Sequence, residues 1–542
     1  MMARTPTTIL HLLVTLVCIL STSARTSAYS SDVVVDAFLG CLSADIPPSL
    51  IYTPANNSYS SVLLSSARNL RYALPEPDTC TRPLVIVAAT KPAHVQTTVL
   101  CGRRHSVHVR TRSGGHDHEG LSYASVDPHR RDFAVLDLAA LRAIDMDASR
   151  AEAWVGSGAT IGELYYAAAA TNRTLGFPAG SCPTVGIGGH LSGGGFGVLS
   201  RKYGLSADNV LDAVVVDAEG RLLNRSTMGE DLFWAIRGGG GESFGVVLSW
   251  KVRLVPVTET VTVFSIRRRR NESAVDLITK WQAIAPALPR DLYLRVMVQN
   301  QQADFVAQFL GRCSSLVDTM RGHFPDLGMA EQDCQEMSWV KSTVFFFYGT
   351  ADLPPEVLLN RSSNPYYHLK VKSDYVQEAM PRHAWESIWS NWLEKPEAST
   401  SLLQLDPYGG RMGSISPSAT PFPHRNYLYQ LQLYAVWFDD DDDNNRTAAL
   451  ELEKRMTSWV RGAHDDVTPY VSKNPRAVYV NCRDLDLGTN ELDGNVTSYA
   501  KARVWGEKYF NDNFNRLAAV KSKVDPHDFF RNEQSIPPLP AS

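Results

Sequence analysis

Glycine gathers in three short stretches of this 542-residue chain, at residues 112–116, 180–197 and 238–241, and this feature most restricts the fold. Because glycine has no side chain, the backbone amides of such loops can approach a ligand closely. Successive N–H groups then form a cradle for an anion such as a pyrophosphate. The clusters therefore predict a dinucleotide cofactor. Tight turns in a β-rich domain are the alternative, and they explain one cluster more easily than three.

The glycine pattern does not indicate a Rossmann site. No strict G-x-G-x-x-G occurs in the clusters, and none of them opens a strand-to-helix turn with an acidic residue suitably placed downstream. A different nucleotide-binding architecture is expected.

Strand-like and helix-like stretches alternate up to about residue 257, which is typical of an α+β or α/β domain. Residues 84–88 predict a strand, residues 91–100 a helix and residues 107–110 another strand. Hairpins are predicted at residues 214–220 and again at residues 245–252.

Beyond Pro256 the pattern changes, and residues 292–298 and 427–434 predict long strands. Side chains alternate between the two faces of a strand. In the second of these strands, one face carries Tyr427, Tyr429, Leu431 and Leu433, and the other carries Leu428, Gln430, Gln432 and Tyr434. One face is therefore expected to pack, while the other offers amides and phenols to a polar ligand.

The N-terminus has the order of a secretory signal peptide, which we place at residues 1–28. Arg4 precedes an apolar run at residues 9–20, and small residues follow it. The run is too short to span a bilayer, and a buried N-terminal helix is the alternative. In a secreted chain, N-x-S/T sequons are credible glycosylation sites. They occur at Asn56, Asn172, Asn224, Asn271, Asn360, Asn445 and Asn495.

Charge and cysteine content narrow the possible partners. The net charge of −4 points to no polyanionic partner such as nucleic acid. Of eight cysteines, Cys18 lies in the signal, so an odd number remains in an oxidising compartment. Cys182 is our candidate for the residue outside any disulfide. No motif indicates a metal site or a membrane anchor.

Long motifs connect the chain to a known family. Residues 112–123, which begin Arg-Ser-Gly-Gly-His, resemble the flavin-attachment segment of the berberine bridge enzyme-like family. Residues 177–190, which contain Cys-Pro-Thr, resemble its second attachment segment. Residues 479–488 and 524–538 resemble its C-terminal signature. The resemblance covers essentially the whole mature chain and extends to the grass group 4 pollen allergen branch.

The resemblance implies an α+β fold like that of vanillyl-alcohol oxidase. A PCMH-type FAD-binding domain is expected at residues 29–257, with its core at about 78–257. A middle substrate-binding domain at residues 258–475 is expected to be an antiparallel sheet backed by helices. The C-terminal berberine-bridge segment, residues 476–542, is expected to complete the FAD domain.

The resemblance also assigns the cofactor and its contacts. In this family the histidine of S-G-G-H is linked to the 8α-methyl group of the flavin, and the cysteine of C-P-T to C6. Covalent FAD is therefore expected on His116 and Cys182, and two links generally raise the flavin potential and so favour hydride uptake. Further expected cofactor contacts are Arg112, Ser113, Gly114, Gly115, Asp117, Gly180, Val185, Gly186, Gly189, His190, Gly193, Gly197 and Asn481.

Family chemistry moves a hydride from a small alcohol or phenol to flavin N5 while a base takes a proton. The reduced flavin then passes its electrons to O2, giving H2O2, or to another acceptor. Oxidases of the family usually carry valine three residues after the attachment cysteine, where Val185 stands, and His190 also matches their pattern. O2 is therefore the expected acceptor.

The catalytic positions depart from the monolignol-oxidising members. Those members have tyrosine at the positions of His118 and Cys482 and lysine at that of Gln430, whereas Gln432 matches a polar position facing the substrate. His118 is the candidate base because an imidazole pKa of about 6.5 suits an acidic wall. Cys482 is a poorer substitute, since a free thiol has a pKa of about 8.5. A different substrate, such as a carbohydrate alcohol, fits these changes.

Three hypotheses remain open for a secreted chain in the cell wall. The first is an FAD-linked oxidase of a small carbohydrate or phenolic alcohol. The second is a flavin dehydrogenase with an acceptor other than O2. The third is a cell-wall glycoprotein that keeps the fold and has lost turnover.

Overall fold

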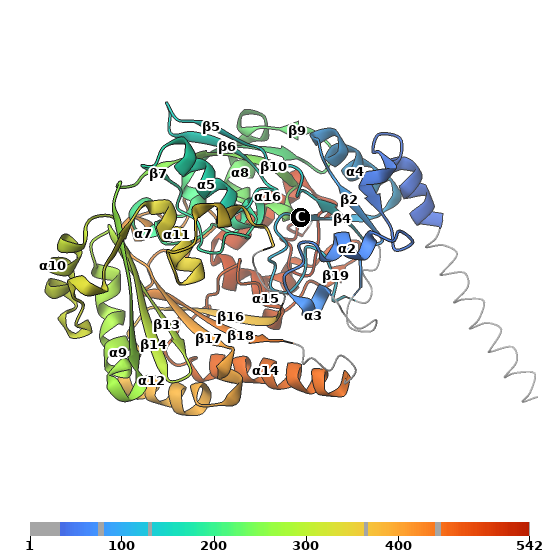
Figure 1. Ribbon diagram of the computed structural model, residues 1–542. Coiled ribbons are helices and arrows are strands. Elements are labelled where there is room, and N and C mark those ends of the chain that lie inside the picture. Colours follow the sequence, from blue (N-terminus) through green and yellow to red (C-terminus); the bar gives the residue numbers. More distant parts are fainter. Residues whose placement is uncertain (1–32, 74–80, 128–132, 363–366, 439–445, 541–542) are drawn as a thin grey trace, which may run out of the picture.

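The computed structural model describes residues 33–73, 81–127, 133–362, 367–438 and 446–540 (Figure 1). The predicted signal peptide lies outside these ranges. Three main sheets, of four, five and seven strands, build the described part of the chain. The predicted α+β class, with an antiparallel sheet backed by helices, is confirmed.

The first sheet has the order β1-β2-β4-β3, with β1 Ile51–Tyr52, β2 Val85–Ala88, β4 Phe133–Asp137 and β3 His108–Arg112. Strands β2, β4 and β3 are parallel, and helix α4, Pro92–His105, connects β2 to β3. A parallel pair needs such a crossover because the chain must return to the same end of the sheet.

The second sheet is antiparallel, in the order β5-β6-β10-β8-β9. Its strands are β5 Ile144–Asp147, β6 Glu152–Gly156, β10 Val246–Arg253, β8 Val210–Val216 and β9 Leu222–Leu223. The hairpin predicted at residues 214–220 is present as the β8–β9 pair. The hairpin predicted at residues 245–252 is wrong: β10 is one strand, paired on one edge with β6 and on the other with β8, and no turn interrupts it.

The third sheet has seven antiparallel strands in the order β15-β12-β14-β13-β17-β18-β16. They are β15 Gln335–Met337, β12 Val261–Arg269, β14 Gln302–Phe309, β13 Leu292–Gln299, β17 Leu402–Pro407, β18 Tyr429–Trp437 and β16 His368–Val376.

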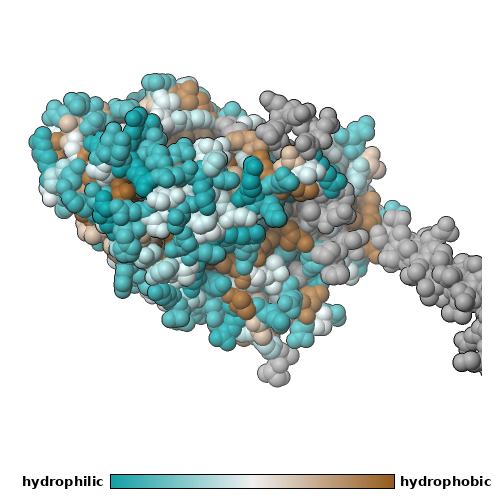
Figure 2. Space-filling view, turned by 90° about the horizontal axis from the view of Figure 1, so that it is seen from below, coloured by the Kyte–Doolittle hydropathy of each residue, from teal (hydrophilic) through white to brown (hydrophobic). Residues whose placement is uncertain are grey.

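One face of this sheet is covered by helices and the other faces the first two sheets (Figure 1). The covering helices are α9 Ala274–Ile284, α10 Cys313–His323, α12 Arg382–Ile388 and α14 Arg446–Asp466. Tyr429, Leu431 and Leu433 of β18 belong to this buried layer, whereas Gln432 and Tyr434 face a cavity on the other side. The outer face of the covering helices is largely hydrophilic (Figure 2).

The C-terminal segment packs against the N-terminal half. It carries helices α15, Tyr499–Phe510, and α16, Asn513–Val524. Glu533 forms a buried ion pair of 3.0 Å with Arg110 of β3, and the Lys521 ammonium donates to the Ser243 carbonyl at 2.7 Å. The exact residues at which the domains divide stay a prediction.

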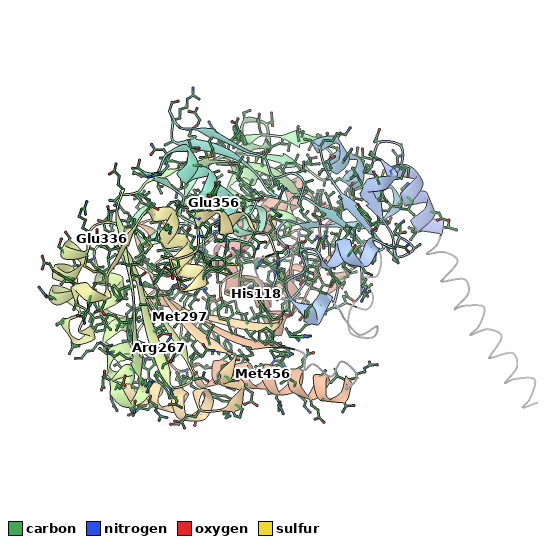
Figure 3. All side chains as sticks on the ribbon, in the orientation of Figure 1. His118, Arg267, Met297, Glu336, Glu356 and Met456 are labelled. Carbon is green, nitrogen blue, oxygen red and sulfur yellow. A yellow bond between two sulfur atoms is a disulfide. The ribbon has the colours of Figure 1, made fainter. Side chains whose placement is uncertain are left out.

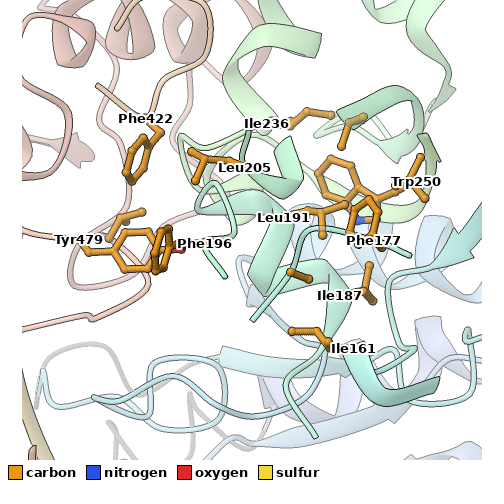
Figure 4. Packing of buried hydrophobic residues seen from close by; sticks show 14 of the residues in the cluster. Ile161, Phe177, Ile187, Leu191, Phe196, Leu205, Ile236, Trp250, Phe422 and Tyr479 are labelled. Carbon is orange, nitrogen blue, oxygen red and sulfur yellow. Dashed lines mark hydrogen bonds between the residues drawn. The ribbon is translucent and has the colours of Figure 1, made fainter. Parts of the chain in front are cut away.

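The largest core is built on strands β6, β8 and β10 of the second sheet and on the helices and loops that pack against them (Figure 4). Leu191 of α6, Ile187–Ser192, packs there among Ile161, Phe177 and Trp250. Helix α5, Ile161–Thr171, begins with a capping box in which the Thr160 hydroxyl accepts from the Glu163 amide. The other large helices are α8 Arg225–Ile236 and α11 Trp339–Tyr348.

Two disulfides, Cys41–Cys101 and Cys313–Cys334, occur in the described ranges, and Cys182 belongs to neither of them. The six sequon asparagines within those ranges, all except Asn445, are exposed. Within the same ranges, no helix is both long and apolar enough to cross a membrane. No cluster of possible metal ligands occurs among the described residues either.

Candidate active site

A cavity of about 320 Å³ lies between the glycine-rich loops and the free face of the seven-stranded sheet. All three glycine clusters contribute to its wall. His118 lies between the two halves of the molecule, above the sheet in the view of Figure 3. The cavity thus forms where segments far apart in the sequence meet.

The two expected attachment residues converge on one hydroxyl group. The Thr184 Oγ1 lies 2.9 Å from His116 Nε2 and 3.5 Å from Cys182 Sγ. Burial lowers the pKa of His116 to about 3, and the charge of Arg68 and the neighbouring His118 add to this effect. The imidazole is therefore neutral at physiological pH, and a neutral ring nitrogen is the nucleophilic form.

The glycines of these clusters have two different roles, close packing of loops and open space for a ligand, which the sequence alone did not distinguish. A Cβ on Gly114 would lie 2.3 Å from the Gly186 amide nitrogen, so this pair lets the two attachment loops touch each other. A Cβ on Gly189 would meet nothing within 4 Å, although Gly189 lines the cavity. The open backbone at Gly189 is the place where a bound dinucleotide has room to approach, so the loops fit the expected FAD.

Residues of the C-terminal signature, 479–488, also line the cavity and contact the glycine-rich loop at residues 180–197. The Tyr479 hydroxyl accepts hydrogen bonds from the Gly195 and Phe196 amides, at 3.2 and 3.3 Å. The Asn481 amide donates to the His190 carbonyl at 3.1 Å. Burial lowers the pKa of His190 to about 4, and its neutral Nε2 accepts from the Gly180 amide at 3.2 Å.

A polar cluster centred on Asp406 covers the sheet side of the cavity. Its Oδ1 accepts from the Tyr293 hydroxyl, and its Oδ2 accepts from the Gln404 amide at 2.7 Å and from the Gln432 amide at 3.4 Å. Arg295 Nε lies 3.7 Å from Oδ1. The carboxylate side chain is 2% exposed, so its charge is balanced within the protein by Arg295.

Two residues expected to act as bases, His118 and Cys482, are held in their neutral forms. Burial lowers the pKa of His118 to about 4; Asp117 opposes this shift and Lys370 adds to it. His118 Nδ1 has no hydrogen-bond partner in the described part of the chain. Burial, together with the Asp406 carboxylate, raises the pKa of the Cys482 thiol, and the thiol donates to Gln432 Oε1 at 3.5 Å.

The cavity brings together most of the predicted site residues. Those that line it are Ser113, Gly114, Gly115, His116, Asp117, His118, Gly180, Cys182, Val185, Gly186, Gly189, His190, Gly193, Gly197, Gln432, Asn481 and Cys482. Residues from four distant segments of the chain therefore meet around one cavity.

Two predicted site residues do not line the cavity. The Arg112 guanidinium is buried against Asp137 and donates to the Leu63 carbonyl at 2.6 Å, so it holds the attachment loop from behind. Gln430 is fully buried, and although its partner on β17, Asp406, lines the cavity, Gln430 itself does not. Its expected contact with substrate stays a prediction.

Sequence reasoning missed Tyr293, Arg295, Gln404 and Asp406. They lie on β13 and β17, more than a hundred residues apart in the chain, and no motif marks them. A signal was present: both strands alternate apolar and polar residues, as Leu403-Gln404-Leu405-Asp406 does. Only the pairing of β17 with β13 on one edge and with β18 on the other shows that these polar residues meet.

Glycine-rich loops that bring a histidine and a cysteine to one threonine hydroxyl, opposite a polar sheet face, fit the class of FAD-dependent oxidoreductases. The family models agree: an FAD binding domain matches residues 83–226, and a berberine and berberine-like domain matches residues 478–537. The chain is 52% identical over 503 residues to berberine bridge enzyme-like Cyn d 4 of Cynodon dactylon, and the match covers 93% of each chain. The chain belongs to the berberine bridge enzyme-like family of FAD-linked oxidoreductases.

Two further relatives indicate the range of chemistry. Tetrahydroberberine oxidase of Berberis wilsoniae is 46% identical over 537 residues, covering 96% of this chain and 97% of that one. The crystal structure of Phl p 4, described as a grass pollen allergen with glucose dehydrogenase activity, has a TM-score of 0.88 at 48% identity and covers 93% and 99% of the two chains. A Phl p 4 variant with valine in place of one isoleucine is described as a glucose oxidase.

Proposed function

We propose that this chain is a secreted oxidase that carries FAD on both His116 and Cys182 and oxidises a carbohydrate alcohol. In the overall reaction, one alcohol group and one O2 are converted to one carbonyl group and one H2O2. The cluster around Asp406 is the observation that carries the choice of substrate. When bound, FAD would accept the hydride that leaves the carbon of the alcohol.

Double attachment is supported by the position of both residues around Thr184 Oγ1. A nucleophilic nitrogen and a sulfur atom meet there, at 2.9 and 3.5 Å from the same oxygen. The neutral imidazole of His116 has the lone pair that bond formation needs.

A hydroxyl-rich substrate is supported by the chemistry of the sheet face. A sugar offers several hydroxyl groups, each of which donates and accepts a hydrogen bond. Asp406, Arg295, Gln404 and Gln432 present a carboxylate, a guanidinium and two amides side by side. The glucose dehydrogenase activity named for Phl p 4 fits the same chemistry.

Asp406 is our candidate for the group that receives the hydroxyl proton. Among the described residues that line the cavity, it is the carboxylate on the sheet side. The Cys482 thiol remains protonated because its pKa is raised, so it acts as a hydrogen-bond donor. His118 is neutral but a weak base at a pKa of about 4, and it is better suited to orient the substrate.

O2 as acceptor is supported by Val185, which lines the cavity three residues after Cys182. A short β-branched side chain leaves more space beside the ring than isoleucine. The glucose oxidase activity named for the isoleucine-to-valine variant of Phl p 4 agrees with this role.

Secretion is supported by the N-terminal signal pattern, the two disulfides and the exposed sequons. Disulfides persist in oxidising compartments and are rare in the cytosol. The protein would therefore act in the cell wall, where N-linked glycans occupy the exposed sequons.

The proposal is tested by anaerobic mixing of the purified flavoprotein with glucose, with other aldoses and with coniferyl alcohol. We expect the aldoses to bleach the flavin absorbance and admitted air to restore it with release of H2O2. Bleaching by coniferyl alcohol alone would contradict the carbohydrate assignment. Bleaching that air does not reverse identifies a dehydrogenase, and a flavin that no alcohol reduces favours a protein without turnover.

A further inference from the structure

A second cavity of about 320 Å³ lies away from the active site and shares no described lining residue with it. It is enclosed by strand β16, helices α14 and α15, and residues 476–487. Its charged lining is mainly cationic, with Lys372, Arg461, Arg476 and Lys508 facing Asp465 and Asp486.

The acidic residues near this cavity are already engaged. Asp486 accepts from Arg461 at 2.8 and 2.9 Å and lies 2.9 Å from the Lys372 ammonium. Asp374, behind the wall, accepts from Arg476 at 2.6 and 2.7 Å. The side chain of Asp465 is 79% exposed and faces water. Lys372 is also held by Asp484 at 2.7 Å, so Lys508 is the one cation lining this cavity that has no carboxylate partner among the described residues.

Lys508 is that cation. In the part of the chain that the structure describes, its ammonium has no hydrogen bond or ion pair, although it lines the cavity. Burial lowers the pKa of Lys508, and the charges of Arg476 and Lys372 act in the same direction, while the Asp484 carboxylate opposes them. A cation among cations is an unfavourable arrangement, and a bound anion would relieve it.

His464 adds a donor to the same wall. Its Nε2 has no hydrogen-bond partner among the described residues, and it lies 3.3 Å from Asp374 Oδ2 without the geometry of a hydrogen bond. The residue is 7% exposed, and burial together with Arg476 and Lys372 lowers its pKa to about 2. The ring is therefore neutral and can donate one N–H to a ligand without adding charge.

We infer that this second cavity binds a small oxyanion, held by Lys508, Lys372, Arg461 and the imidazole of His464. Charge-assisted hydrogen bonds from ammonium and guanidinium groups suit phosphate, sulfate and carboxylate alike. Free inorganic phosphate and the carboxylate of an acidic sugar share this chemistry. The site joins the sheet, helix α14 and the C-terminal segment, so occupation should stabilise their packing.

The test is titration calorimetry of the holoprotein with inorganic phosphate and, separately, with galacturonate, with ionic strength held constant by NaCl. We expect a Kd of about 1 mM or tighter for one of them, weakened about tenfold by Lys508→Gln. The matched control is Lys501→Gln on the same helix, because Lys501 is exposed and paired with Glu491 outside the cavity. Binding of phosphate would identify the ligand of this cavity as an inorganic oxyanion. Binding of galacturonate alone would identify it as a carboxylate.

Two results would overturn the inference: no saturable binding of either anion, or binding that Lys508→Gln leaves unchanged. Arg461→Gln, on a different helix, provides a second variant in case the first is poorly folded. In the absence of anion, Lys508→Gln should melt at the same temperature as the parent protein or higher, because it removes the repulsion from Arg476 and Lys372. A clearly lower melting temperature would instead assign Lys508 a structural role.

Discussion

The two walls of the active-site cavity are built in different ways. The flavin wall comes from loops whose functional residues are close in sequence, such as His116 with His118 and Cys182 with Val185. The sheet wall is assembled from β13, β17 and β18, which contribute Arg295, Asp406 and Gln432. The proposed cofactor attachment therefore depends on local segments of the chain, whereas the proposed substrate recognition depends on strand pairing.

The largest effect is expected on the flavin wall, from replacing both attachment residues. His116→Ala with Cys182→Ser should leave no flavin colour in acid-precipitated protein, because both covalent links are gone. Each single variant should keep the colour in the pellet through the remaining link. The absorbance spectrum before and after precipitation measures this, and colour released from the parent protein would contradict double attachment.

The matching change on the sheet wall is Asp406→Asn. It preserves shape and removes the carboxylate, so kcat should fall about 10²–10⁴-fold, the usual range for a lost general base. Covalent flavin should be retained, since Asp406 is hydrogen-bonded to Tyr293, Gln404 and Gln432 on the sheet and not to the attachment loops. Stopped-flow measurement of flavin reduction distinguishes a slower chemical step from a loss of attached flavin. A variant in which only KM changes would show that Asp406 binds substrate without receiving the proton.

A smaller effect is expected from Val185→Ile, which fills the space beside the attachment loop. Reoxidation by O2 should slow by about tenfold or more, equivalent to about 1.4 kcal/mol in barrier height. Flavin reduction should change much less because the substrate contacts belong to the other wall. Mixing the reduced enzyme with air-saturated buffer gives the rate of flavin reoxidation. Equal rates in the two proteins would show that Val185 does not control the access of O2.

The smallest effect concerns the protonation of His118. Its pKa is near 4 in the folded chain and about 6.5 when unfolded, so the unfolded state binds more protons between these values. Folding stability should therefore fall as the pH is lowered from 6.5 to 4. At pH 4.5 the loss attributable to His118 should be about 1 kcal/mol, once its partial exposure to the cavity is considered.

Urea unfolding at pH 7 and 4.5 tests this, with His118→Gln expected to be less sensitive to acid than the parent. The acid limb of the kcat profile should lie at the same pH in both proteins if Asp406 receives the proton. An acid limb near pH 6.5 that disappears in His118→Gln would restore His118 as the base.

The accuracy of sequence reasoning follows the same division. Because motifs and period-two alternation are local patterns, the sequence indicated the two glycine-rich segments that line the cavity and the strand of Gln432. The alternation holds from Tyr429 onward, whereas Leu428 packs with the helix-covered layer. Arg112 and Gln430 were expected to meet ligand, and neither lines the cavity. Arg112 pairs with Asp137 on the neighbouring strand, and Gln430 is fully buried opposite Asp406 of β17.

The sequence by itself determined the α+β class, the family and the residues that can carry FAD, since each depends on contiguous motifs. Only the tertiary structure decided that Asp406 joins Tyr293, Arg295 and Gln432, and that Lys508 lies among cations without a carboxylate partner in the described residues. The physical reason is that charge and hydrogen bonding act over a few ångströms in space. Strands and helices distant in sequence come that close only when the sheet has paired and the C-terminal segment has packed.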